Sequence, residues 1–132
     1  MNISKACLNL IKKWEGCKLE AYIDPVGIPT IGYGTISYPN GTNVKIGDRI
    51  TQEQADGFLQ HECNSIVPRI VKLVSVGLTQ NQFDALISFA YNVGVGAFAE
   101  STLLSKLNNG DYQGAAAEFN KWNKGRSEEH TS

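Results

Sequence analysis

Three residues near the start of the chain have side chains suited to breaking a glycosidic bond. Glu15 follows Trp14 at the expected end of a helix, Asp24 lies nine residues further on, and Thr30 six residues after that. Glycosidic cleavage needs two carboxyl groups in unlike environments, one protonated to donate to the leaving oxygen and one ionised. The negative end of the helix dipole and the neighbouring indole both favour the protonated form of Glu15. Glu15 is therefore the candidate acid and Asp24 the candidate carboxylate.

On spacing alone, both acids also have ordinary interpretations. Glu15 could be a solvated residue at a helix end, and Asp24 precedes Pro25 in a turn, where aspartate is common. Two acids nine residues apart occur in most proteins, so the pair by itself does not establish an active site.

The elements around these residues place them on two facing structures. Apolar residues recur at helical spacing from Ile3 to Trp14, and Ser4 and Gly16 are suited to cap the two ends, which predicts a helix over Ser4–Glu15. From about residue 19 to residue 45, β-forming residues alternate with turn residues, which predicts a small antiparallel sheet. The helix end and the sheet edge should face each other across a cleft.

The rest of the chain, about residues 51–125, is predicted to be a helical lobe. Capping-box patterns at Thr51 and Thr79 begin two helices. We expect the first to reach about Leu73 and to bend or break near Pro68, and the second to end at Gly94 and Gly96. Two short helices should follow, over about 101–107 and 112–122. The fold class is therefore α+β, with an N-terminal helix, a small antiparallel β-subdomain and then a mainly helical lobe.

Composition and charge exclude several other classes of protein. The chain has 132 residues, 42% hydrophobic and 19% charged, with a formal net charge of −1 and no clustered basic patch, so we expect neither nucleic-acid binding nor membrane insertion. Three cysteines at unrelated spacings indicate reduced thiols, and no signal peptide is apparent, so synthesis in a cytoplasm is expected. No cofactor is expected. A metal site at His61 is disfavoured because the residues around it do not form a metal-binding pattern.

Three blocks of sequence resemble the phage lysozymes of the T4-lysozyme family. The first is Trp-Glu-Gly at 14–16, the second is Ala-Tyr-Ile-Asp-Pro-Val-Gly at 21–27 with Thr-Ile-Gly-Tyr-Gly at 30–34, and the third is the apolar stretch at 82–94. They occur in the family's order, and the similarity covers about residues 3–124. The resemblance implies a lysozyme-like fold and a muramidase that hydrolyses the β-1,4 bond between N-acetylmuramic acid and N-acetylglucosamine in bacterial peptidoglycan.

The resemblance also assigns roles to individual residues. Glu15 matches the general acid, Asp24 the carboxylate that guides the attacking water, and Thr30 a hydroxyl that helps to hold this water. Tyr22 and Asn92 match substrate-binding positions in the cleft. Thr35 departs from the pattern, because many members carry histidine after the Gly-x-Gly.

For a phage lysozyme we expect a monomer that accumulates in the host cytoplasm. It would reach the cell wall or periplasmic peptidoglycan after release, with a holin as the release partner. Two rivals stay open: a lytic transglycosylase, which uses one acid and no catalytic water and is disfavoured by Asp24 and Thr30, and a non-catalytic peptidoglycan-binding module made inactive by truncation.

The last seven residues do not fit the rest of the sequence. Residues 126–132 contain no apolar residue, whereas the family continues with a Gly-rich turn and a basic, amphipathic last helix. The run also resembles the translation of a common sequencing adapter. We therefore expect a lysozyme-like domain over residues 1–125, followed by a non-native polar tail at 126–132 in a C-terminally truncated chain.

Overall fold

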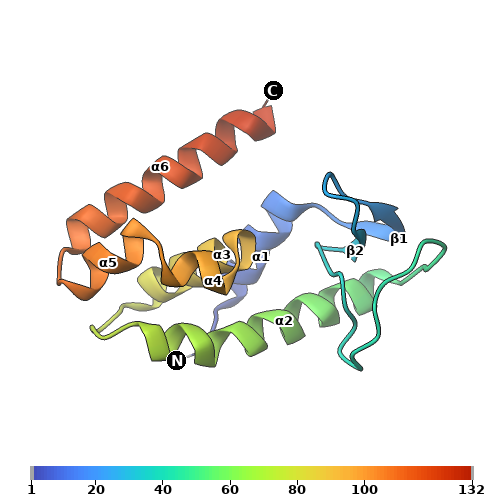
Figure 1. Cartoon of the computed structure of the whole chain (residues 1–132), viewed down its shortest axis with the longest axis horizontal. Coiled ribbons are helices and arrows are strands. Elements are labelled where there is room, and N and C mark those ends of the chain that lie inside the picture. Colours follow the sequence, from blue (N-terminus) through green and yellow to red (C-terminus); the bar gives the residue numbers. More distant parts are fainter. Residues whose placement is uncertain (1, 132) are drawn as a thin grey trace.

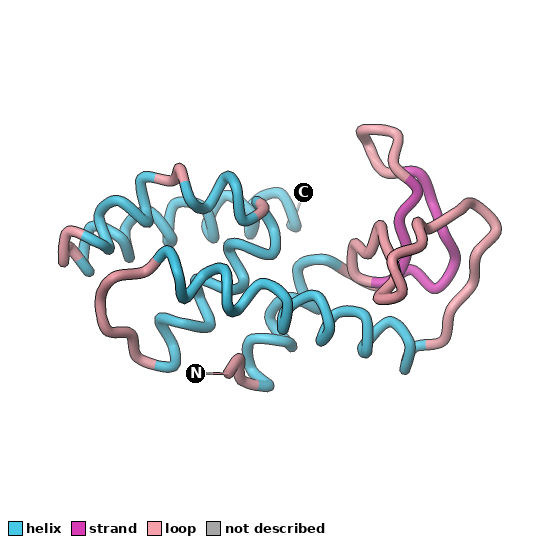
Figure 2. The backbone as a smooth tube through the Cα atoms, turned by 60° about the horizontal axis from the view of Figure 1, so that its bottom comes forward, coloured by secondary structure: helices cyan, strands magenta, loops and turns pink. Residues whose placement is uncertain are grey.

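The computed structural model describes the backbone of residues 2–131 and the side chains as far as Asn123. In chain order the elements are α1 (Lys5–Glu15), β1 (Lys18–Ile23), β2 (Pro29–Gly32), α2 (Gln52–Leu73), α3 (Gln80–Val93), α4 (Val95–Ala99), α5 (Thr102–Asn108) and α6 (Tyr112–Thr131). The sheet lies near one end of α2, and the other helices gather toward the opposite end (Figures 1 and 2). This is the predicted arrangement of a helix, a small sheet and a helical lobe.

Helix α1 begins and ends as the sequence predicts. The Ser4 hydroxyl accepts the N–H of Cys7 as an N-cap, and Gly16 ends the helix at a positive φ of 67°, which favours glycine. Cys7 and Ile11 form the buried face, which packs against α3. Asp84 of α3 accepts hydrogen bonds from both the N–H and the hydroxyl of Ser4, which fastens the start of α1 to the helical lobe.

The β-subdomain is a two-stranded antiparallel sheet with long connecting loops. Tyr22 of β1 pairs with Thr30 of β2, and the register shifts between Lys18 and Tyr22. A further antiparallel bridge joins Glu20 to Arg49. The sheet therefore holds the loop before α2 as well as its own turn.

Helix α2 is one continuous helix, so of the two alternatives expected near Pro68, a bend or a break, the break is wrong. A proline within a helix removes one hydrogen bond to the residue four positions earlier, here Asn64. Both Pro68 and Asn64 are exposed, so water can replace the lost bond. The predicted capping boxes are present at the starts of α2 and α3.

The helix that follows α3 is absent from the sequence prediction. Gly94 ends α3 with φ at 93°, and α4 begins at the next residue, so Gly96 lies inside a helix instead of terminating one. The burial of Phe98, which is fully inaccessible to solvent, stabilises this short helix despite its glycine.

Helix α6 is also longer than predicted, since its backbone stays helical from Tyr112 to Thr131. The prediction of a non-native polar tail at residues 126–132 concerns side chains outside the described residues.

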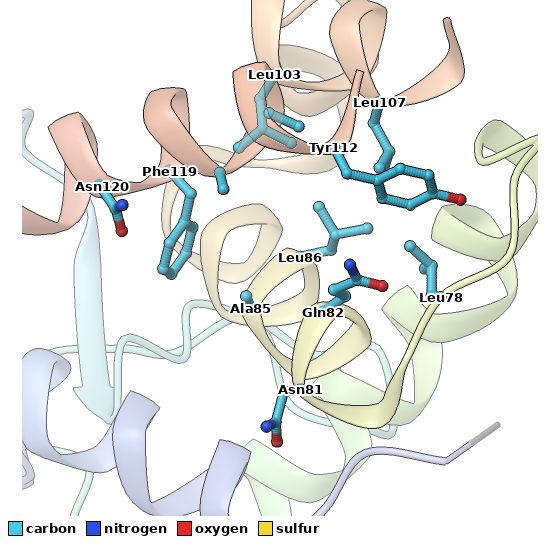
Figure 3. Close-up of a pocket in the computed structure, with 12 residues that line it drawn as sticks. Leu78, Asn81, Gln82, Ala85, Leu86, Leu103, Leu107, Tyr112, Phe119 and Asn120 are labelled. Atoms are coloured by element: carbon cyan, nitrogen blue, oxygen red, sulfur yellow. The ribbon is translucent and has the colours of Figure 1, made fainter. Parts of the chain in front are cut away.

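The core of the helical lobe is built from side chains of α1 to α6. Cys7 and Cys63 are buried in it, Cys17 is half-buried, and all three are free thiols, as predicted. An apolar cavity of about 220 Å³ lies where Leu86 of α3 faces Leu107 of α5 and Phe119 of α6 (Figure 3). Among the described residues, no helix combines the length and hydropathy needed to cross a membrane.

Candidate active site

Glu15 lies where the ends of α1 and α3 meet the loop that contains Tyr33 and Gly34 (the glycine loop). It is the last residue of α1 and is half-buried. Its Oε1 accepts a hydrogen bond of 3.2 Å from Nδ2 of Asn92, near the end of α3. A Cβ built on Gly34 would stand 3.9 Å from Oε2, and Gly34 has φ of 88°, so glycine allows the loop to approach the carboxyl group.

Asp24 organises the turn between the two strands. Its Oδ1 accepts the N–H groups of Val26 (2.9 Å) and Ile28 (2.8 Å). The N–H of Asp24 also bonds to the carbonyl of Ile28, at 3.0 Å. These three bonds fix the carboxyl group relative to the sheet and occupy one of its oxygens.

Thr30 is held by the same turn. Its side chain is buried, and its hydroxyl donates to the carbonyl of Ile28 at 2.9 Å, so Ile28 links Thr30 to Asp24. A hydroxyl whose proton is engaged in this way keeps lone pairs with which to accept a hydrogen bond.

Tyr22 lies on β1, and its pKa responds to the charges of both candidate acids. Its ring is 37% exposed and lies opposite Thr30 in the register of the sheet. Partial burial raises the pKa of Tyr22, and the negative charges of Asp24 and Glu15 raise it further. The charges of both carboxyl groups therefore affect the same phenol, and Tyr22 pairs with Thr30 across the sheet.

Two side-chain contacts at this site were missed by the sequence analysis. Trp122 of α6 donates its Nε1–H to Oδ1 of Asn92 at 3.2 Å. Tyr91 donates its hydroxyl proton to the carbonyl of Tyr33 in the glycine loop. Helical periodicity identifies such aromatic residues only as core positions. Thirty residues separate Trp122 from Asn92, so no local sequence pattern indicates their contact, and none indicates that of Tyr91.

Thr35, where the sequence departs from the family's histidine, is buried at 1% exposure. Its N–H and carbonyl pair with those of Ile31, which closes the tight loop around Gly34. Within the described residues its hydroxyl has no hydrogen-bond partner. Thr35 therefore stabilises the loop through its backbone.

The chemistry of this site depends on carboxyl and hydroxyl groups. Within the described part of the chain, no three His, Cys, Asp or Glu side chains lie close enough together to hold a metal ion. The apolar cavity of the helical lobe is lined by none of the predicted site residues. A carboxyl group at a helix end and a second one in the turn of a sheet are the kind of pair that glycoside hydrolases use.

The comparisons with known proteins agree with this class. The family model described as "Phage lysozyme" matches residues 12–131. An endolysin of Acyrthosiphon pisum secondary endosymbiont phage 1 is 48% identical over 126 residues, covering 96% of this chain and 83% of the relative. An endolysin of Bacillus phage B103 is 49% identical over 125 residues, covering 94% of this chain but only 46% of the longer relative.

A solved structure is similar over most of the fold. The endolysin from Escherichia coli O157:H7 phage FAHEc1 superposes with a TM-score of 0.83 at 45% identity, covering 92% of this chain and 76% of that one. The chain therefore belongs to the phage lysozyme family.

Proposed function

We propose that this chain is a muramidase that hydrolyses the β-1,4 bond between N-acetylmuramic acid and N-acetylglucosamine in peptidoglycan. The observation that carries the proposal is that Glu15 ends α1 while Asp24 is fixed in the turn of the sheet, and that the negative charges of both raise the pKa of Tyr22. Two carboxyl groups held on separate elements can work on opposite sides of one glycosidic bond.

In this mechanism Glu15 is the general acid. Glu15 is half-buried at the C-terminal end of α1, and its Oε1 accepts the side-chain N–H of Asn92. The proton passes from Glu15 to the glycosidic oxygen as the bond to the anomeric carbon breaks.

Asp24 and Thr30 direct the attacking water. The Oδ1 atom of Asp24 is engaged by two N–H groups, which complement its negative charge and leave Oδ2 as an acceptor. Because the Thr30 proton is engaged by Ile28, its hydroxyl oxygen also acts as an acceptor. A water that donates one hydrogen to each residue presents a lone pair to the anomeric carbon, and Asp24 then takes up its proton.

Tyr22 and Asn92 supply the proposed contacts to the sugar. Tyr22 is a partly exposed tyrosine on β1, and Asn92 is an exposed amide beside the proposed acid. The proposal extends to action on the cell wall or periplasmic peptidoglycan, by a monomer that leaves the host cytoplasm through a holin.

The test is release of new reducing ends from purified peptidoglycan. The wild-type chain should release them, and Glu15→Gln should lower the rate by about 10²-fold or more, since general acid catalysis contributes ~10²–10⁴-fold. Glu20→Gln is the matched control, because Glu20 is an exposed glutamate on β1, five residues after Glu15, and is paired with Arg49 at 3.3 Å. It should keep the wild-type rate.

Other outcomes identify the rival functions. Cleavage without new reducing ends would indicate a lytic transglycosylase. Binding to peptidoglycan without cleavage would indicate a non-catalytic module. Full activity in folded Glu15→Gln would exclude Glu15 as the acid.

A further inference from the structure

The geometry points to Trp122 as a positioning residue for the Glu15 carboxyl group, acting through the side-chain amide of Asn92. The inference rests on the proposed role of Glu15 as the acid. Trp122 Nε1 lies 3.2 Å from Asn92 Oδ1, and Asn92 Nδ2 lies 3.2 Å from Glu15 Oε1. One chain of hydrogen bonds therefore runs from α6 through α3 to the end of α1.

The indole determines which way the Asn92 amide faces. An indole N–H can only donate a hydrogen bond, whereas an amide has a donor end and an acceptor end. With its oxygen held by Trp122, the amide of Asn92 must direct its N–H group toward Glu15. Without the indole, the amide could turn its oxygen toward the carboxyl group at little cost.

Aromatic packing holds the indole itself in place. Its ring lies edge-to-face on Phe89, with centroids 5.1 Å apart and planes at 88°, and it contacts Phe119 at 5.5 Å. Phe89 stands three residues before Asn92 on α3, so the indole is anchored to the helix that carries the amide. The packing leaves Trp122 little freedom to follow a different hydrogen-bond partner.

The orientation of the amide decides where the acid carries its proton. The Oε1 atom of Glu15 accepts the N–H of Asn92, and an oxygen engaged in this way is the weaker site for a proton, so the bond favours protonation at Oε2. Oε2 is the oxygen nearer Gly34, 3.9 Å from the position that a Cβ there would take. Trp122 thereby selects the oxygen from which the proton reaches the glycosidic bond.

The direct test is Trp122→Phe, which keeps an aromatic ring on Phe89 and removes the N–H. We expect kcat on purified glycan strands to fall about threefold to tenfold, the equivalent of one hydrogen bond, with KM changing by less than about twofold. The alkaline limb of the kcat–pH profile should move up by about half a pH unit, because a turned amide favours the protonated acid. A merely structural loss would lower kcat without moving this limb.

Two further variants make the result specific. Tyr112→Phe also removes one aromatic donor from α6, the hydroxyl that bonds to the Gly77 carbonyl, and should leave kcat and the pH profile unchanged. If Trp122 acts through Asn92, adding Trp122→Phe to Asn92→Ala should change kcat by less than about twofold. The inference would be overturned if the loss of kcat in the double variant equalled the product of the losses in the two single variants. It would also be overturned if Trp122→Phe left the alkaline limb of the kcat–pH profile unchanged.

A measurement on the wild-type chain separates this inference from the proposed function. In NMR spectra, the indole N–H of Trp122 and the side-chain amide of Asn92 should both follow the titration of Glu15, and Glu15→Gln should abolish this response. The readout does not depend on activity or on the stability of a Trp122 variant. An active enzyme whose indole N–H ignores the titration would retain the proposed function and lose the positioning role.

Discussion

Asp24 combines a structural task and a proposed chemical task, and two substitutions separate them. Its Oδ1 accepts the N–H groups of Val26 and Ile28, and its charge is proposed to direct water. Asp24→Asn keeps an oxygen that can accept both N–H groups but removes the charge. Asp24→Ala removes the charge and both hydrogen bonds.

The hydrogen bonds of the turn set the expected loss of stability. Each bond contributes about 0.5–1.5 kcal/mol net, and water replaces part of this because the turn is exposed. Asp24→Ala should therefore lower the free energy of unfolding by about 1–2 kcal/mol, and Asp24→Asn by less than about 1 kcal/mol. Both should lower the rate of cleavage by about 10²-fold or more, because neither supplies a base.

Urea denaturation measures the free energies of unfolding. Release of reducing ends measures the rates, in buffer without urea and at a temperature at which each variant is folded. The expected pattern is a difference in stability between the two variants with a similar loss of rate. If Asp24→Asn kept more than about a tenth of the wild-type rate, while Asp24→Ala lost it, the turn would be the feature that activity requires and the proposed base would be wrong.

Two further predictions follow from the same geometry. If the second carboxylate directs water, the two candidate carboxyl groups should lie about 6.5–9.5 Å apart, and NMR of the first product should show inverted anomeric configuration; retention would contradict the mechanism. Asp84→Ala should lower the free energy of unfolding by about 2–4 kcal/mol, because Asp84 is the buried acceptor for Ser4. Asp56→Asn, which weakens the partly exposed ion pair with Lys12, should cost less than about 1 kcal/mol, and equal losses in urea denaturation would refute this reasoning.

Local sequence patterns predicted the elements whose stability is itself local. The N-cap at Ser4 and the capping boxes at Thr51 and Thr79 involve residues within one helical turn, so they can be recognised without knowledge of the fold. The turn before Thr30 was predicted for the same reason. The candidate residues Glu15, Asp24 and Thr30 could be proposed from the sequence because their motifs are short and occur in a fixed order.

Errors arose where packing outweighs local preference. Gly94 and Gly96 together indicate the end of a helix, yet α4 begins between them because Phe98 is buried in the core. Pro68 indicates a break, yet α2 continues because packing along its buried face outweighs one lost hydrogen bond at an exposed position.

The sequence by itself determined the order of the elements, their caps and the residues with the chemistry of a glycoside hydrolase. Only the tertiary structure decided how these residues meet. Asn92 and Trp122 lie 77 and 107 positions from Glu15. Asn92 reaches it because α3 packs on α1, and Trp122 reaches Asn92 because its ring packs edge-to-face on Phe89. A contact of this kind depends on how helices pack across the core, and no periodicity within one helix encodes it.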